Sequence, residues 1–257
     1  HHHAALHGDV PPQRDRVHPV NALQRVGAWL LACGTIVVGC GVAAPDASRM
    51  GGDAGCNEGD VRALSDGRVT GGVYVSRVVS FSPGAGASFG ASEMPGIVMG
   101  PPQGAGDFMG STDTVSLGRG GEIVVAFDLA ITDGPGADFV VFENPFQVPG
   151  APVRYWEELG EVSVSDDGET WRTFACDPRA GRPYTHCAGW NPVYSAPGSG
   201  YCPTDLRTAG GDPFDLAAVG LRRARYVRIR DLATQGLSPP ATGFDLDAIA
   251  VIHPLPR

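Results

Sequence analysis

The chain has 257 residues, of which 42% are hydrophobic, and it contains 37 Gly and 22 Pro. This composition favours a domain rich in turns over one built from long helices, and the length suits a single good-sized domain with a tail. The formal net charge of -9 argues against nucleic acid as a partner and is compatible with cation binding.

The first part of the chain has the pattern of an export signal. Arg25 precedes an apolar run at residues 26–38, which is shorter than the roughly 20 residues of a membrane-spanning helix. The sequence "VVGC" that ends this segment resembles the lipobox of bacterial lipoproteins, and the resemblance implies that Cys40 is the lipidated first residue of the mature chain. An ordinary signal or a short membrane anchor stays open. We therefore assign residues 1–39 to an upstream extension and signal, and residues 40–68 to a flexible tether.

Four further cysteines lie beyond the tether start, namely Cys56, Cys176, Cys187 and Cys202. Four cysteines in an exported domain predict two disulfides. Cys176 and Cys187 bracket a short loop that contains Pro and Gly, which favours a local bridge and leaves Cys56 to pair with Cys202. The alternative is a zinc site, which the absence of a C-x-x-C pair disfavours.

Almost every periodic segment of the remaining chain has strand character. Side chains alternate in short runs rich in β-branched and aromatic residues, at 73–82, 121–128, 138–144, 161–174, 224–232 and 243–253. The run at 161–174 contains a turn and predicts a hairpin, whereas the sequence around Asp215 favours one helical turn. Short strands with turns at fairly even spacing predict an all-β antiparallel sandwich, in one domain at residues 69–254.

Several motifs of these strands and loops resemble a family of predicted bacterial cell-surface proteins or lipoproteins. They are "VVSFSPG", "GPPQG", "SLGRGGEI", "DFVVFEN", "EVSVSDDGETW", "GGDPFDLAAVGL" and "GFDLDAIAVI", within about residues 70–253. The family resembles galactose-binding-like jelly rolls of the discoidin and carbohydrate-binding-module type. The resemblance implies that fold and a surface location, and it brings no established catalytic residue.

Two carboxylates stand inside the last predicted strand. Because side chains alternate along a strand, Asp245 and Asp247 would share one face, about 7 Å apart. In one interpretation they pair with Arg228 and Arg230, which also share a strand face, since a buried charge requires a partner. Exposure of the two carboxylates to solvent is a further alternative.

In the other interpretation the same carboxylates help to bind Ca²⁺, which takes six to eight oxygen ligands. The jelly-roll resemblance favours this interpretation, because such domains commonly hold a structural Ca²⁺ near the ends of their terminal strands. The predicted calcium ligands are Asp138, Glu143, Asn144, Asp245 and Asp247.

Aromatic residues in the predicted loops form a candidate ligand site. Trp156, Trp190, Tyr184 and Tyr194 could stack on the apolar faces of a carbohydrate or another cell-surface polymer. Alternatively, these rings cover loops and disulfides.

Motifs of catalysis are weak in this sequence. His186 and His253 are the histidines of the predicted domain, and neither lies near a nucleophile motif; the sequence "PGSGY" lacks the spacing of a nucleophile elbow, and no P-loop or H-E-x-x-H sequence occurs. We therefore expect an exported, non-catalytic, carbohydrate-binding protein that meets the membrane only through its lipid anchor. The alternatives are a structural or adhesive surface protein without a small ligand, and a hydrolase using Glu157, Glu158 or Glu161.

Overall fold

The computed structural model describes residues 56–59, 61–65, 69–150, 152–234 and 243–255. The chain divides into two units, 1–46 and 47–257. The predicted signal at 1–39, Cys40 and most of the tether lie outside the described residues, so their interpretation stays a prediction. Within the described ranges, the structure contains no helix that is long and apolar enough to cross a membrane.

The described part of the chain is all-β, and its strand pairs are antiparallel. The larger sheet has the order β10–β9–β13–β5–β16, with β11 also paired to β9 and β3 also paired to β5. Its strands are β3 (Arg77–Ser82), β5 (Glu122–Thr132), β9 (Gly160–Ser165), β10 (Arg172–Thr173), β11 (Cys187–Ala188), β13 (Arg223–Asp231) and β16 (Pro254–Leu255).

A second sheet has the order β12–β6–β15, and three two-stranded sheets complete the strands. The second sheet contains β6 (Phe139–Phe142), β12 (Asp212–Phe214) and β15 (Ala248–Val251). The two-stranded sheets are β1 (Val61–Ala63) with β2 (Val69–Gly71), β4 (Val115–Ser116) with β14 (Asp245–Leu246), and β7 (Phe146–Val148) with β8 (Arg154–Trp156). The described helices are short 3₁₀ turns: η2 (Ala91–Glu93), η3 (Gly96–Val98) and η4 (Leu216–Val219).

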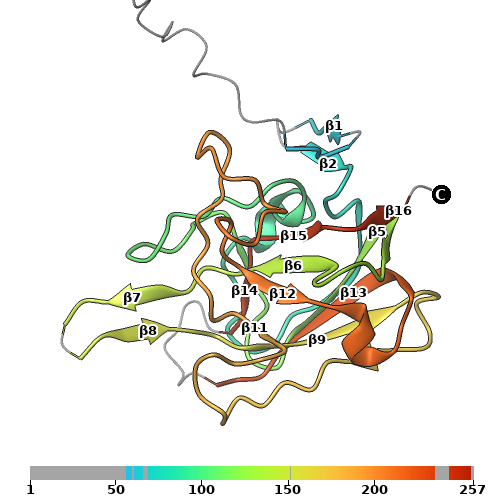
Figure 1. Ribbon diagram of the computed structural model, residues 1–257. Coiled ribbons are helices and arrows are strands. Elements are labelled where there is room, and N and C mark those ends of the chain that lie inside the picture. The colour runs from blue at the N-terminus through green and yellow to red at the C-terminus, as the bar shows by residue number, and fades with distance from the viewer. Residues whose placement is uncertain (1–55, 60, 66–68, 151, 235–242, 256–257) are drawn as a thin grey trace, which may run out of the picture. The chain divides into compact units, whose positions relative to one another are not determined.

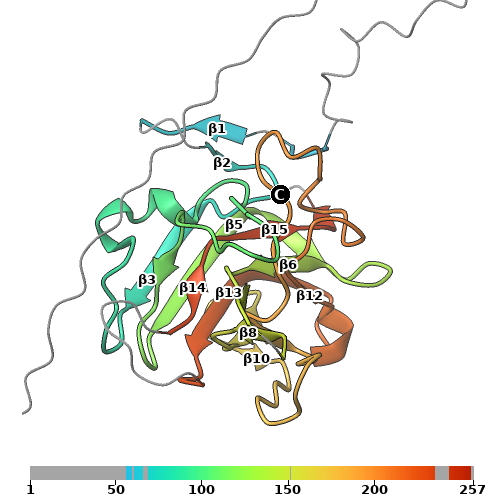
Figure 2. The same ribbon diagram turned by 90° about the vertical axis from the view of Figure 1, so that its left-hand side faces the viewer.

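The two larger sheets face each other across one hydrophobic core. Figure 2 shows β6, β12 and β15 on one side and β3, β5 and β13 on the other. All four residues of β6 and all four of β15 are buried, and Ile123, Val227 and Ile229 of the larger sheet belong to the same core. Two sheets packed over a shared apolar core form a β-sandwich, as the sequence predicts. The jelly-roll connectivity stays a prediction.

Two predicted strands are divided between sheets. In the segment 73–82, Tyr74 bridges Ala250 beside the smaller sheet, whereas β3 pairs with β5 of the larger one. In the segment 243–253, β14 pairs with β4 and β15 pairs with β6. The chain changes partner at Asp247, so Asp245 and Asp247 do not lie in one continuous strand, contrary to the prediction.

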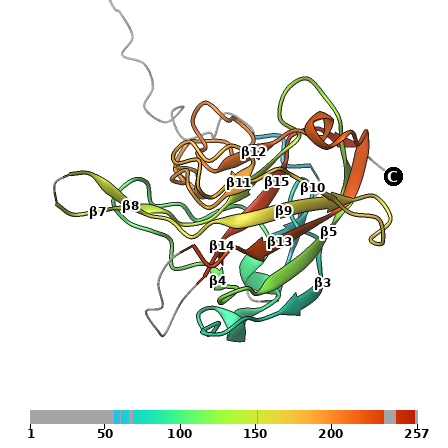
Figure 3. The same cartoon turned by 90° about the horizontal axis from the view of Figure 1, so that it is seen from below.

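Both predicted disulfides are present. Cys56 joins Cys202 and Cys176 joins Cys187, with Cα–Cα distances of 5.4 and 4.7 Å. The predicted helical turn is also confirmed as η4, which Asp215 caps by accepting a hydrogen bond from the Ala217 N–H. The β7–β8 hairpin extends away from the sandwich in two perpendicular views (Figures 1 and 3), and it leads the chain back to β9.

Candidate functional site

Three carboxylates from separate parts of the chain meet beside the sandwich. Glu143 directly follows β6, Glu158 lies just before β9, and Asp245 begins β14. Each offers an oxygen that lies within 4.8 Å of the oxygens of the other two. The ends of β6 and β14 and the entry to β9 therefore create one acidic cluster, which we call the carboxylate cluster.

The carboxylate cluster is buried and lacks a compensating side-chain cation. Glu143 is 1% exposed and Glu158 5% exposed. Oε2 of Glu143 and Oδ1 of Asp245 are buried without a hydrogen-bond partner. Among the described residues, no Arg or His forms an ion pair with any of the three carboxylates. Buried carboxylate oxygens without a donor or a cation are costly, so the cluster requires a bound cation or bound protons.

Burial raises the pKa of all three groups, and repulsion from other carboxylates, which for Asp245 is that of Asp231, adds to the shift. Burial, followed by repulsion from Asp245 and Glu158, holds the pKa of Glu143 well above its usual range. Burial and the charge of Asp245 raise the pKa of Glu158 to about 7. Burial is also the main cause that raises the pKa of Asp245 to about 6. In the absence of a cation, the cluster therefore holds protons at pH values where exposed carboxylates have lost them.

Backbone N–H groups and polar side chains hold the other oxygens of the cluster. The Asp245 N–H donates to Oε1 of Glu143 at 3.2 Å, and the Gly243 N–H donates to Oε1 of Glu158 at 2.8 Å. Ser116 and Asn144 hydrogen bond to the side chain of Asp245. These contacts orient the carboxylates of the cluster.

The cluster fits an oxygen-binding cation such as Ca²⁺. Two oxygens that each lie about 2.4 Å from one Ca²⁺ can be at most about 4.8 Å apart, which agrees with the separation in the cluster. Three carboxylates with two unpartnered buried oxygens provide charge and free ligand atoms, and Ca²⁺ prefers such hard donors.

The structure brings together three of the five predicted calcium ligands, namely Glu143, Asn144 and Asp245. It adds Glu158, which the sequence analysis considered only for hydrolysis. A signal for Glu158 was available, since the acidic pair Glu157–Glu158 precedes a predicted strand in the same way that Asp245 precedes β15.

Asp138 and Asp247 do not belong to this cluster, which corrects the prediction. Asp138 is fully buried and accepts hydrogen bonds from the Gly134 N–H, the Leu216 N–H and Nδ1 of His253, each within 2.8 Å. Asp247 accepts the Gln103 N–H at 2.9 Å. Both carboxylates hold loops by accepting backbone N–H groups, and Asp138 also forms a separate acidic group with Asp133 and Asp215.

The alternative pairing with arginines is also wrong. Arg230 pairs with Glu161 at 3.0 Å. Arg228 lies 3.9 Å from Glu122 and 4.6 Å above the ring of Trp171. The ion pairs of both arginines are therefore with other acids, Glu122 and Glu161.

Two of the four predicted ligand aromatics line a pocket of about 340 Å³. Tyr184 and Trp190 form part of its wall, together with Asp212 of β12 and Asp215. The Cys176–Cys187 disulfide ties the loop that carries Tyr184, and Cys187 also lines the pocket. The bridge therefore holds the loop of this pocket in place.

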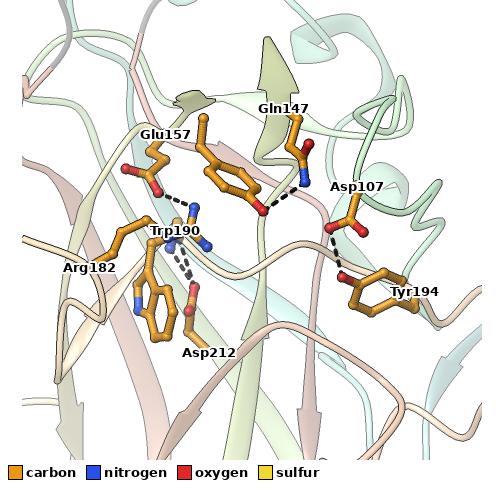
Figure 4. Close-up of polar contacts among 9 residues, drawn as sticks. Asp107, Gln147, Glu157, Arg182, Trp190, Tyr194 and Asp212 are labelled. Atoms are coloured by element: carbon orange, nitrogen blue, oxygen red, sulfur yellow. Dashed lines mark hydrogen bonds and ion pairs between the residues drawn. The ribbon is translucent and has the colours of Figure 1, made fainter. Parts of the chain in front are cut away.

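An arginine covers the aromatic rings next to the pocket. The Arg182 guanidinium lies 3.7 Å from the ring centre of Tyr155 and 5.4 Å from that of Trp190, and it pairs with Glu157 at 2.5 Å. Figure 4 shows Arg182, Glu157, Trp190 and Asp212 on one side of the view. The burial of Glu157 raises its pKa, while attraction to Arg182 opposes this shift.

The other two predicted aromatics have different surroundings. The side chain of Trp156, at the end of β8, hydrogen bonds to Glu158 and so adjoins the carboxylate cluster. The Tyr194 hydroxyl donates to Asp107 at 2.8 Å, apart from Trp190 in Figure 4. The three glutamates considered for hydrolysis are likewise separated by function, because Glu157 pairs with Arg182, Glu158 joins the cluster and Glu161 pairs with Arg230.

No protein-family model matches the chain, and a search of curated proteins also finds no match. The resemblance inferred from the sequence motifs therefore stays a prediction, and the functional argument rests on the geometry above.

Proposed function

We propose that this protein is an exported, lipid-anchored, non-catalytic binding protein of a bacterial surface. Its β-sandwich holds a structural Ca²⁺ and binds carbohydrate. The observation that carries the proposal is the carboxylate cluster, in which buried oxygens of Glu143 and Asp245 have no partner. A cation of charge +2 removes most of the repulsion among Glu143, Glu158 and Asp245 and supplies the missing interactions.

The cluster brings together three segments that no sheet hydrogen bonds connect directly. Glu143 follows the smaller sheet, Glu158 precedes a strand of the larger one, and Asp245 lies in the β4–β14 pair. An ion bound to all three would fix these segments to each other, which is the role of a structural metal.

Thermal unfolding of the full chain in Ca²⁺ and after removal of Ca²⁺ tests the metal site. We expect Ca²⁺ to raise the melting temperature of the wild type in a saturable way. Glu143→Gln should lose the response to Ca²⁺, because the substitution replaces a carboxylate ligand with an amide that carries no charge. Glu169→Gln removes one exposed carboxylate from the turn before β10 and should respond like wild type. Equal responses of all three proteins would refute the site.

Carbohydrate binding is supported by the pocket beside Trp190. Its wall combines the aromatic side chains Tyr184 and Trp190 with the carboxylates of Asp212 and Asp215. Aromatic faces pack on the C–H faces of sugars, while carboxylates accept hydrogen bonds from sugar hydroxyls. A pocket with a few convergent polar groups is typical of small-ligand sites.

A glycan array probed with the full chain in Ca²⁺ tests this part. We expect Trp190→Ala to lose retention of the glycans that wild type binds, and Trp171→Ala, which removes a Trp that packs on Arg228, to keep it. Absence of retention by wild type would favour the structural or adhesive alternative.

Two observations support export and lipidation. The two disulfides are typical of an oxidising compartment, and the sequence around Cys40 resembles a lipobox. Metabolic labelling with a radioactive fatty acid in a bacterial host should mark the wild type and not Cys40→Ser.

A further inference from the structure

The pocket beside Trp190 has an acidic wall. Asp212 and Asp215 line it, and none of its lining residues is an Arg. The nearby Arg182 is already paired with Glu157. His186 also lines the pocket, so a ligand that enters it meets two carboxylates and one imidazole, and no guanidinium or ammonium group of the wall.

The carboxylate of Asp212 is buried, and the protein satisfies only one of its two oxygens. Asp212 is 1% exposed, and its Oδ2 accepts the N–H groups of Gly189 at 2.6 Å and of Trp190 at 3.2 Å. Its Oδ1 has no hydrogen-bond partner. Burial raises the pKa of this carboxyl to about 8, although the backbone N–H groups and the nearby charge of Arg182 oppose the shift. A cation next to Oδ1 would favour the ionised form and satisfy the free oxygen.

The aromatic residues of the wall complement a positive charge. Tyr184 and Trp190 line the same pocket as Asp212, and aromatic faces attract ammonium and guanidinium groups. Arg182 gives an example within this protein, since its guanidinium lies over Tyr155 and Trp190. A carboxylate and aromatic rings around one small pocket together favour an organic ammonium group.

We propose that the pocket lined by Asp212, Tyr184 and Trp190 recognises an amino sugar with a free ammonium group. This inference rests on the carbohydrate-binding function proposed above and names the class of sugar. The ammonium donates to Oδ1 of Asp212, and the sugar ring packs on Trp190. An N-acetyl group at the same carbon carries no charge and one N–H donor, so it satisfies the site less well.

Calorimetric titration of the full chain in saturating Ca²⁺ tests the inference. The probes are the tetrasaccharide of β-1,4-linked glucosamine, its fully N-acetylated counterpart and a β-1,4-linked glucose tetrasaccharide. We expect the glucosamine tetrasaccharide to bind at least about tenfold tighter than the other two, as a desolvated ammonium contact would give. Asp212→Asn should lower this preference to about threefold or less.

The control variant is Asp166→Asn, which removes the same charge from an exposed turn where Asp166 pairs with Arg223. It should keep the full preference, which separates specific recognition from attraction of a cationic oligosaccharide to an acidic protein. The melting temperature of Asp212→Asn and its affinity for the N-acetylated probe show whether the pocket is still formed.

The outcomes distinguish the inference from the function on which it rests. Equal binding of all three probes, or an undiminished preference in Asp212→Asn, overturns the ammonium assignment and leaves carbohydrate binding in place. If no probe binds while the glycan array shows retention, the assignment is again wrong. Failure of both experiments overturns carbohydrate binding itself.

Discussion

The stability that Ca²⁺ confers should depend steeply on pH, because protons and Ca²⁺ compete for the same carboxylates. In the folded protein without Ca²⁺, the pKa of Asp245 rises from 3.8 to about 6 and that of Glu158 from 4.5 to about 7. The folded state therefore holds more protons than the unfolded chain between about pH 4 and 7, so protein stripped of Ca²⁺ loses stability as pH rises through this range.

The expected magnitude follows from these shifts. A tenfold change in proton affinity corresponds to about 1.4 kcal/mol, so each of Asp245 and Glu158 contributes on the order of 3 kcal/mol. Part of this energy is repulsion shared between the two groups, and we expect about 4 kcal/mol for both together. For a domain of this size, about 4 kcal/mol corresponds to a difference of roughly 10 °C in melting temperature.

The assay is thermal unfolding of Ca²⁺-stripped and Ca²⁺-saturated full chain at several pH values from 4.5 to 8. Here we expect the difference between the two melting temperatures to be small at about pH 4.5 and to reach roughly 10 °C at about pH 8. A calcium effect that is the same at all pH values would refute the reasoning, because the ion would then bind groups that do not titrate in this range.

Three further variants test other parts of the structure. Asp138→Asn should destabilise the protein by about 2–3 kcal/mol in urea unfolding, since an amide cannot accept from all three donors, yet it should leave calcium affinity unchanged. Cys176→Ser with Cys187→Ser should cost about 2–3 kcal/mol and weaken binding at the Trp190 pocket, as measured by calorimetry. Gly189→Ala should weaken both ligand and calcium binding, because Gly189 has a φ of 93°, its N–H holds Asp212, and a Cβ there would collide with the backbone carbonyl oxygen of Glu158.

Much of the fold could be predicted because local patterns agree with the tertiary structure. The alternating, β-branched runs became strands, and the Asp215 turn became η4. The breaks at residues 73–76 and at Asp247 could not be predicted, since a strand that changes sheets keeps its alternating pattern while its hydrogen-bonding partner changes. Because "GFDLDAIAVIH" reads as one continuous strand, its sequence does not indicate that β14 and β15 pair with different strands.

The candidate site could be predicted only in part, because several of its contacts form only when distant segments of the chain come together in the fold. Glu143, Asn144 and Asp245 end or begin strands with strong patterns, and the sequence therefore indicated them. Asp138 has the same sequence character, but its loop supplies backbone donors that only the folded structure reveals. Asp212 was missed, because its free oxygen depends on a pocket formed with residues 184–190.

Direct measurement of calcium binding tests the central claim most directly. Calorimetric titration of Ca²⁺ into the stripped full chain at about pH 7.5 should show one saturable site with a dissociation constant below about 1 mM, the range of extracellular calcium modules. Glu143→Gln should abolish this binding and Glu169→Gln should preserve it. No saturable binding up to about 10 mM Ca²⁺, or unchanged binding in Glu143→Gln, would contradict the assignment of the carboxylate cluster as a calcium site.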